Sequence, residues 1–109
     1  MTYNNPHTLE RPEYGAELME YDYSFYELGV WIRNGELYIS TDSGCSCYGP
    51  WESHTESDLT GPLTVDQVEE EATSLAGENE WGKREVADLI VALRAREELL
   101  NTLVEVVSA

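Results

Sequence analysis

The dipeptide Asn34-Gly35 lies between two strand-like segments and constrains the fold more than any other feature of the chain. Both residues tolerate the positive φ of a type I′ turn, so the pair predicts a two-residue hairpin loop. The resulting register places Trp31 opposite Tyr38 and leaves one apolar face, made of Leu28, Val30, Ile32, Leu37 and Ile39. We therefore expect a β-hairpin over about 26–33 and 36–41.

The residues before this hairpin are less regular. Residues 1–17 carry two prolines and little periodicity, which predicts an extended N-terminal arm on a single domain, 1–109. Between Met19 and Ile32 the alternation of apolar residues changes parity. Such a change predicts a bulge or a break near Phe25-Tyr26.

Residues 41–63 are rich in Ser, Thr, Gly, Pro and Asp and predict a long connection, a kind of segment that is often functional. A helix over 65–76 follows. Thr64 and Gln67 have the spacing of a capping box, and Gly77 suits the end of the helix.

Apolar residues recur at helical spacing from Val86 to Val107 and predict a second helix over about 82–106. At 1.5 Å per residue this helix is roughly 37 Å long, so it should span the domain or project beyond it. Arg96 and Glu97 interrupt the apolar stripe. This interruption fits a break, a core helix with an exposed middle turn, or a homodimer through the helix. The predicted fold class is α+β, with a small antiparallel sheet packed against two C-terminal helices.

Acidic residues dominate the charge of the chain. There are 22 Asp and Glu against six Lys and Arg, a net charge of −16. Phosphate backbones and anionic membrane surfaces both attract Lys and Arg, so direct binding to nucleic acid or to a membrane is disfavoured. Protein partners should present basic or apolar surfaces, although surplus acid also serves solubility alone.

Neither a long apolar run nor a signal peptide is present in the sequence. The two cysteines, Cys45 and Cys47, are too close together for a disulfide to gain much chain entropy. They are therefore interpreted as free thiols, which predicts a cytoplasmic location.

The loop that contains these cysteines offers the strongest candidate for a chemical site. Cys45, Cys47, His54 and His7 together would supply the four ligands that Zn²⁺ prefers, and they are all the Cys and His of the chain. The Cys-x-Cys spacing is unusual for such a site, and a tight turn with packed cysteines is the alternative. A catalytic thiol is disfavoured, because Asp42 and Glu52 are the nearest charges and the loop has no cation. No catalytic constellation stands out, so we expect a protein that is not an enzyme and has no cofactor.

Aromatic residues are concentrated between positions 21 and 51. Most should be core residues. If the sheet face that carries them is left uncovered, Trp31, Tyr38 and Trp51 form a candidate interaction surface, because aromatic residues are enriched in binding hot spots.

The aromatic hairpin, the run Asp42-Ser43-Gly44-Cys45-Ser46-Cys47 and Pro50-Trp51-Glu52 together resemble a family of small uncharacterised proteins encoded by actinobacteriophages and their hosts. The resemblance covers residues 20–55; Tyr48-Gly49 and the C-terminal half depart from it. It implies a small phage accessory protein and carries no activity.

Three functions are therefore open. The leading hypothesis is a non-enzymatic protein-binding module that engages a host or phage protein. A second is a DNA mimic that inhibits a DNA-binding protein, since sixteen charges match about 27 Å of duplex. The third is a small metal- or thiol-dependent enzyme that uses the loop from Cys45 to His54.

Overall fold

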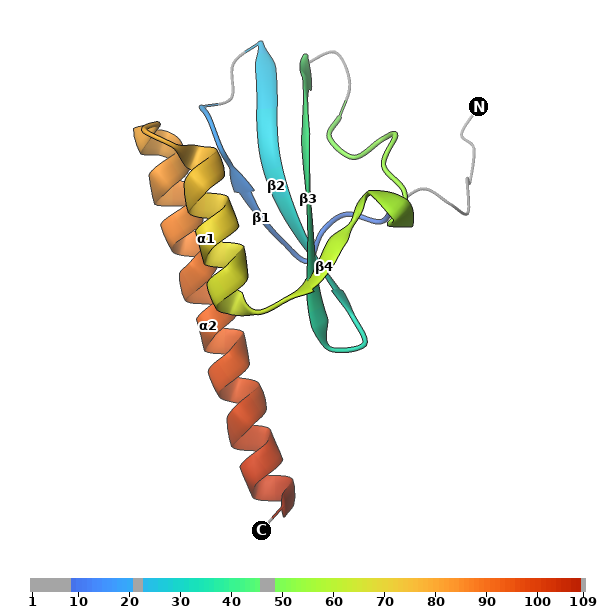
Figure 1. Cartoon of the computed structure of the whole chain (residues 1–109), viewed down its shortest axis with the longest axis vertical. Coiled ribbons are helices and arrows are strands. Elements are labelled where there is room, and N and C mark those ends of the chain that lie inside the picture. The colour runs from blue at the N-terminus through green and yellow to red at the C-terminus, as the bar shows by residue number, and fades with distance from the viewer. Residues whose placement is uncertain (1–8, 21–22, 46–48, 109) are drawn as a thin grey trace.

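A computed structural model describes residues 9–20, 23–45 and 49–108 (Figure 1). In chain order the elements are β1 (Tyr14–Glu17), β2 (Ser24–Arg33), β3 (Glu36–Cys45), the 3-10 turn η1 (Glu56–Asp58), β4 (Thr60–Leu63), α1 (Val65–Ala76) and α2 (Glu80–Ser108). The strands form one antiparallel sheet in the order β1-β2-β3-β4. Both helices pack on the same face of this sheet, which is the predicted α+β fold.

Strands β2 and β3 form the predicted hairpin and extend it at the open end. Asn34 and Gly35 have φ of 55° and 80°, as the type I′ turn requires. Pairing is continuous from Ser24↔Cys45 to Arg33↔Glu36, so the predicted bulge near Phe25-Tyr26 is wrong. The parity changes because β2 is buried on both faces, and a strand of this kind has no single apolar face to maintain.

Two edge strands were not predicted. The last four residues of the predicted arm form β1, which pairs with β2 from Tyr14↔Val30 to Glu17↔Glu27, while residues 1–8 of that arm lie outside the described residues. Strand β4 lies within the predicted connection and pairs Leu37 with Leu63. Its sequence, Thr-Gly-Pro-Leu, resembles a turn, and Pro is tolerated there because β4 is at the edge of the sheet.

The bounds of both helices agree closely with those predicted from the sequence. Helix α1 has the predicted bounds, and its capping box is present: Gln67 N donates to Thr64 Oγ1 at 3.1 Å, and Thr64 N donates to Gln67 Oε1 at 2.8 Å. Helix α2 begins two residues earlier than predicted and continues without a break through Arg96 and Glu97. None of the helices in the described part of the chain is long and apolar enough to cross a membrane.

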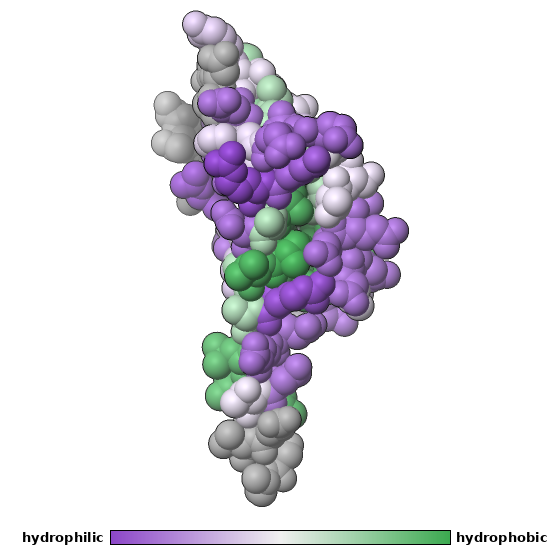
Figure 2. Space-filling model, turned by 90° about the vertical axis from the view of Figure 1, so that its left-hand side faces the viewer, coloured by the Kyte–Doolittle hydropathy of each residue, from purple (hydrophilic) through white to green (hydrophobic). Residues whose placement is uncertain are grey.

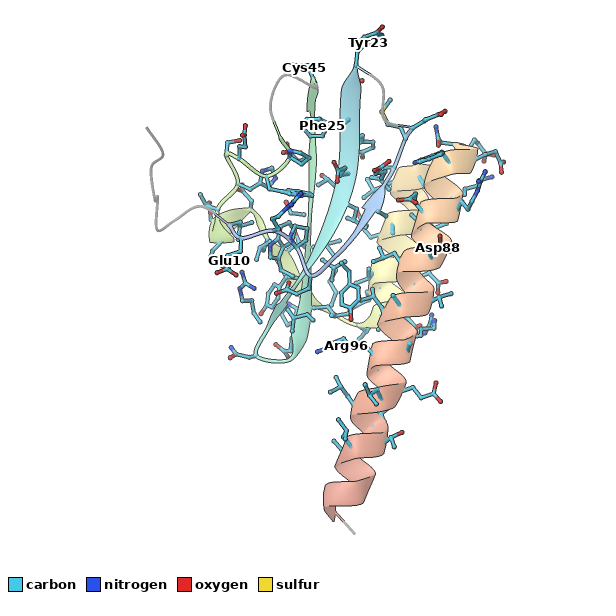
Figure 3. All side chains as sticks on the ribbon, turned by 180° about the vertical axis from the view of Figure 1, so that it is seen from behind. Glu10, Tyr23, Phe25, Cys45, Asp88 and Arg96 are labelled. Atoms are coloured by element: carbon cyan, nitrogen blue, oxygen red, sulfur yellow. The ribbon has the colours of Figure 1, made fainter. Side chains whose placement is uncertain are left out.

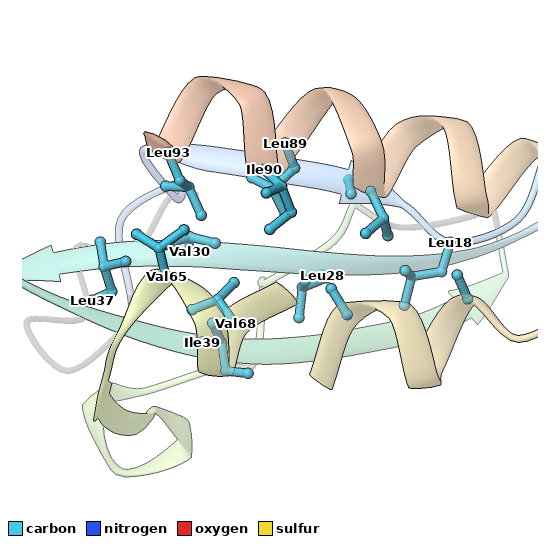
Figure 4. Packing of buried hydrophobic residues seen from close by; sticks show 14 residues of the cluster. Leu18, Leu28, Val30, Leu37, Ile39, Val65, Val68, Leu89, Ile90 and Leu93 are labelled. Carbon is cyan, nitrogen blue, oxygen red and sulfur yellow. The ribbon is translucent and has the colours of Figure 1, made fainter. Parts of the chain in front are cut away.

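The main core lies between the sheet and the two helices (Figure 4). It contains four residues of the predicted apolar face of the hairpin, and the fifth, Ile32, is partly buried and packs against it. Both helices contribute to this core: Val65, Val68 and Ala72 from α1, and Val86, Leu89, Ile90 and Leu93 from α2. Leu93 is the last residue of α2 in this core. The rest of α2 projects past the end of the sheet (Figure 1), as its predicted length implied.

Candidate binding groove

The predicted aromatic surface is covered in this structure. Trp31 is fully buried, and its ring meets that of Trp51 edge to face at 5.0 Å between centroids. Together with Leu9 these two residues form a second, smaller core on the sheet face opposite the helices. Trp31 Nε1 donates to the carbonyl of Glu10 at 2.9 Å, so the chain before β1 closes over the indole. A partner could therefore reach Trp31 only by displacing this cover.

The surroundings of Tyr38 differ from those of Trp31 and Trp51. It is half-buried, and its ring lies directly against the backbone of Gly61 in β4. Although Tyr38 is the cross-strand neighbour of Trp31, the structure does not bring the three predicted residues together on an exposed face.

His54 is fixed by its neighbours. Its Nε2 lies 2.9 Å from the carbonyl oxygen of Thr41, and its Nδ1 lies 3.9 Å from Asp42 Oδ2. Because a carbonyl only accepts hydrogen bonds, Nε2 must carry the proton. The ring also packs edge to face on Trp51. This arrangement leaves only Nδ1 with a lone pair for a metal or for base catalysis, and Nδ1 faces a carboxylate.

Cys45, at the end of β3, is disulfide-bonded, so the prediction of free thiols is wrong for this residue. Cys47 and His7 lie outside the described residues, so the four-ligand zinc set stays a prediction. Among the residues that the structure describes, no three His, Cys, Asp or Glu side chains are placed to hold a metal ion.

Asp42 organises the loop that follows β3, a role that sequence reasoning missed. Its Oδ2 accepts a 2.7 Å hydrogen bond from the backbone N–H of Trp51, and its Oδ1 accepts one of 2.9 Å from Ser43 N–H. Trp51 has a φ of 74°, which a bulky side chain rarely adopts. The hydrogen bond that Trp51 donates to Asp42 therefore helps to hold Trp51 in an unfavourable backbone conformation, in which its ring is buried.

A groove of about 480 Å³ opens between the β3–β4 edge and α1. It exists because β4 pairs with β3 only at Leu37 and Ile39, whereas β3 continues to Cys45. Apolar side chains of both layers line the groove: Ile39, Leu63 and Leu75. The groove was not predicted, since its position depends on the unpredicted strand β4.

Carboxylates also line this groove: Asp58 from η1, and Glu70 and Glu71 from α1. The other two acids of α1 share one cation, because Arg94 Nη2 lies 2.9 Å from Asp66 Oδ1 and 2.8 Å from Glu69 Oε1. These hydrogen bonds raise the pKa of Arg94. No Lys or Arg lines the groove among the described residues, so it favours cationic ligands.

Polar side chains complete the lining of the groove. They are those of Ser, Thr and Gln and the carboxylates, and none of the described lining residues is a His or Cys. The carbonyl of Thr41 on β3 is already occupied by His54. A ligand would therefore be held by its side chains more than by adding a strand to β3.

The chain matches no curated protein and no solved structure. A family model does match it, over residues 1–103, which is nearly the whole chain. The chain thus belongs to the family described as Domain of unknown function (DUF7574).

Proposed function

We propose that this chain is a non-enzymatic module that binds a basic segment of another protein in the groove between α1 and the β3–β4 edge. The observation that carries the proposal is the combination of apolar Ile39, Leu63 and Leu75 with the carboxylates of Asp58, Glu70 and Glu71 in one groove. Amphipathic Lys or Arg side chains fit such a lining, because their methylene stems pack on apolar surface while the cation meets a carboxylate.

The resemblance of the loop around Cys45 to actinobacteriophage proteins supports the biological setting that we propose. In that setting the chain is a phage accessory protein that acts in the host on a host or phage protein. A partner with a basic surface is attracted over several ångströms by the net charge of −16.

DNA mimicry is the less favoured alternative. A mimic needs a regular row of uncompensated charges at about the density of duplex DNA. On α1 the carboxylates of Asp66 and Glu69 share Arg94, so only part of the row stays uncompensated. This pattern suits a local basic segment better than a protein surface shaped to hold a duplex.

The test is affinity capture of the tagged chain from actinobacterial lysate at low and high salt, with three baits. The wild-type bait is compared with Glu71→Lys, which reverses a charge in the groove. The matched control is Asp88→Lys, which makes the same charge change at an exposed position of α2 away from the groove (Figure 3).

We expect a partner that the wild-type and Asp88→Lys baits capture at low salt, that Glu71→Lys loses, and that high salt releases. Equal capture by all three baits would refute the groove as the binding surface. Displacement of the partner by added duplex DNA, with both charge reversals weakening capture alike, would favour mimicry instead.

A further inference from the structure

The part of α2 beyond the core carries an unpartnered apolar stripe. Leu99, Leu100, Leu103 and Val104 are 61%, 41%, 51% and 63% exposed. Their spacing places all four on one side of the helix. Figure 2 shows hydrophobic surface on this projecting part of α2, below the hydrophilic surface of the domain. We call residues 99–104 the tail stripe.

The tail stripe runs into a second groove, of about 430 Å³, which we call the turn groove. It lies between the β2–β3 turn, the junction of β4 with α1, and α2. Leu37, Pro62 and Leu63 give it apolar walls, and Leu100 belongs to both the groove and the stripe. The two surfaces therefore form one continuous face, in which apolar residues are joined by polar and charged ones.

The charges around this face differ from those of the rest of the molecule. Arg96 lies in the turn groove together with Glu36 and Glu97, whereas the groove beside α1 has only acids among its charged lining residues. The guanidinium of Arg96 extends toward the hairpin turn, where Nη2 lies 3.4 Å from Gly35 O (Figure 3). Among the described residues it has no carboxylate within ion-pair distance. With two acids against one base, this face has a smaller acidic surplus than the groove beside α1, so it repels a second copy of this chain less.

We propose that the tail stripe and the turn groove dock a second copy of this chain as an antiparallel, two-fold symmetric pair. In an antiparallel pair the two acidic domains lie at opposite ends, which minimises their repulsion. A parallel pair would place both net charges of −16 side by side. The antiparallel arrangement also brings the far end of each α2 to the turn groove of the other copy, so the same patch is used twice.

The interface of such a pair needs both the tail stripe and the turn groove. From Arg96 to Ser108 the helix extends about 18 Å. Contact between two segments of this length alone falls short of the roughly 800 Å² per partner that stable complexes bury. The turn groove supplies further apolar surface next to the stripe, so a docked helix end would enlarge the interface toward the required area.

Sedimentation equilibrium of the full chain at 0.1 and 0.5 M NaCl tests the pair independently of the proposed function. We expect a mass that rises with concentration to twice the 12.3 kDa of the chain. Because the interface is apolar and added salt screens the repulsion between acidic domains, 0.5 M NaCl should not weaken the dimer. A monomer at both salts up to 200 µM, on the order of the weakest specific interfaces, would overturn the proposal.

Two variants locate the interface. Leu103 lies outside the core, so the Leu103→Glu variant should keep the far-UV spectrum and melting temperature of the wild type. We expect it to raise the dimer dissociation constant at least about 100-fold, because two-fold symmetry buries the substitution twice. Val91→Glu makes the same kind of change at a residue that is 69% exposed on α2 before the stripe, and it should leave the constant within about threefold. A dimer that survives Leu103→Glu, or one that Val91→Glu dissociates equally, would contradict the assigned face.

Discussion

Asp42 and Trp51 are joined by a 2.7 Å hydrogen bond from the backbone N–H of Trp51 to the carboxylate of Asp42. The bond spans nine positions of the sequence and holds the loop after β3 against the sheet. Trp51 in turn covers Trp31, so the small core opposite the helices depends on this contact.

Asp42→Ala should therefore lower the free energy of unfolding by about 1–3 kcal/mol, since a half-buried N–H loses its charged acceptor. Asp42→Asn keeps one acceptor oxygen and should cost less than Asp42→Ala. Urea unfolding followed by far-UV circular dichroism measures both. Equal stability of Asp42→Ala and wild type would show that the loop does not need this bond.

Gly82 marks the closest approach of α2 to the chain that connects β1 and β2. A Cβ on Gly82 would collide with the carbonyl oxygen of Leu18 and would lie 3.3 Å from the Cβ of Ala76. Gly→Ala within a helix usually stabilises by up to about 1 kcal/mol, but here overpacking should reverse the sign and cost about 1–3 kcal/mol.

Thermal unfolding of Gly82→Ala measures this cost. Gly49→Ala is the control, because the nearest atom to its new Cβ is a flexible Glu52 carboxylate oxygen 3.9 Å away. An increase in melting temperature for Gly82→Ala would mean that α2 does not lie against Leu18 this closely.

Glu27 lies in a row of acids across the sheet, with Glu17 and Asp42 as its cross-strand partners. Burial raises the pKa of Glu27 most, and the nearby carboxylate of Glu17 raises it further. Arg11 partly offsets this increase, and Asp42 and Glu85 add to it. The folded state therefore holds this proton more tightly than the unfolded state does. The stability from this group is present at low pH and is lost as the pH rises through the raised pKa.

Glu27→Gln should consequently be more stable than wild type at pH 7. The difference should vanish below the ordinary pKa of a glutamic acid, where both proteins carry a neutral side chain. Urea midpoints at several pH values between 3.5 and 7, about the window in which glutamic acids titrate, test this. A difference that grows as the pH falls would have the wrong sign.

Cys45 is disulfide-bonded, which predicts its reactivity. In protein purified without reductant, iodoacetamide should leave Cys45 unmodified, and it should alkylate Cys45 after treatment with dithiothreitol. Peptide mass spectrometry reads the modification. Alkylation without reductant would instead show the free thiol that the sequence suggested, which the zinc hypothesis for Cys45, Cys47, His54 and His7 requires.

The sequence predicted those parts of the fold that local patterns determine. Asn34-Gly35 set the hairpin register, and Thr64 with Gln67 set the start of α1, because a turn and a cap each need particular residues at fixed offsets. Strand β4 was not predicted, because Gly61 and Pro62 favour a turn locally. Only its pairing with β3 makes this segment a strand.

The candidate groove could not be predicted for the same reason. Its two sides, β4 and α1, are adjacent in sequence. The groove exists, however, only because β4 pairs with β3 no further than Ile39, whereas β3 itself continues to Cys45. Sequence patterns also could not show which residues cover Trp31. The residues that bury it, Leu9 and Trp51, come from irregular segments before and after the hairpin.

Site-specific photo-crosslinking tests the binding groove most directly. Thr60 is exposed and lines the groove, whereas Val91 is exposed on α2 outside it, and both are uncharged. Each is replaced in turn by p-benzoylphenylalanine, and the full chain is irradiated in actinobacterial lysate at low salt. We expect a discrete protein adduct from position 60 that high salt suppresses, and no such adduct from position 91. The same adduct from both positions, or one from position 91 alone, would contradict binding in the groove between α1 and the β3–β4 edge.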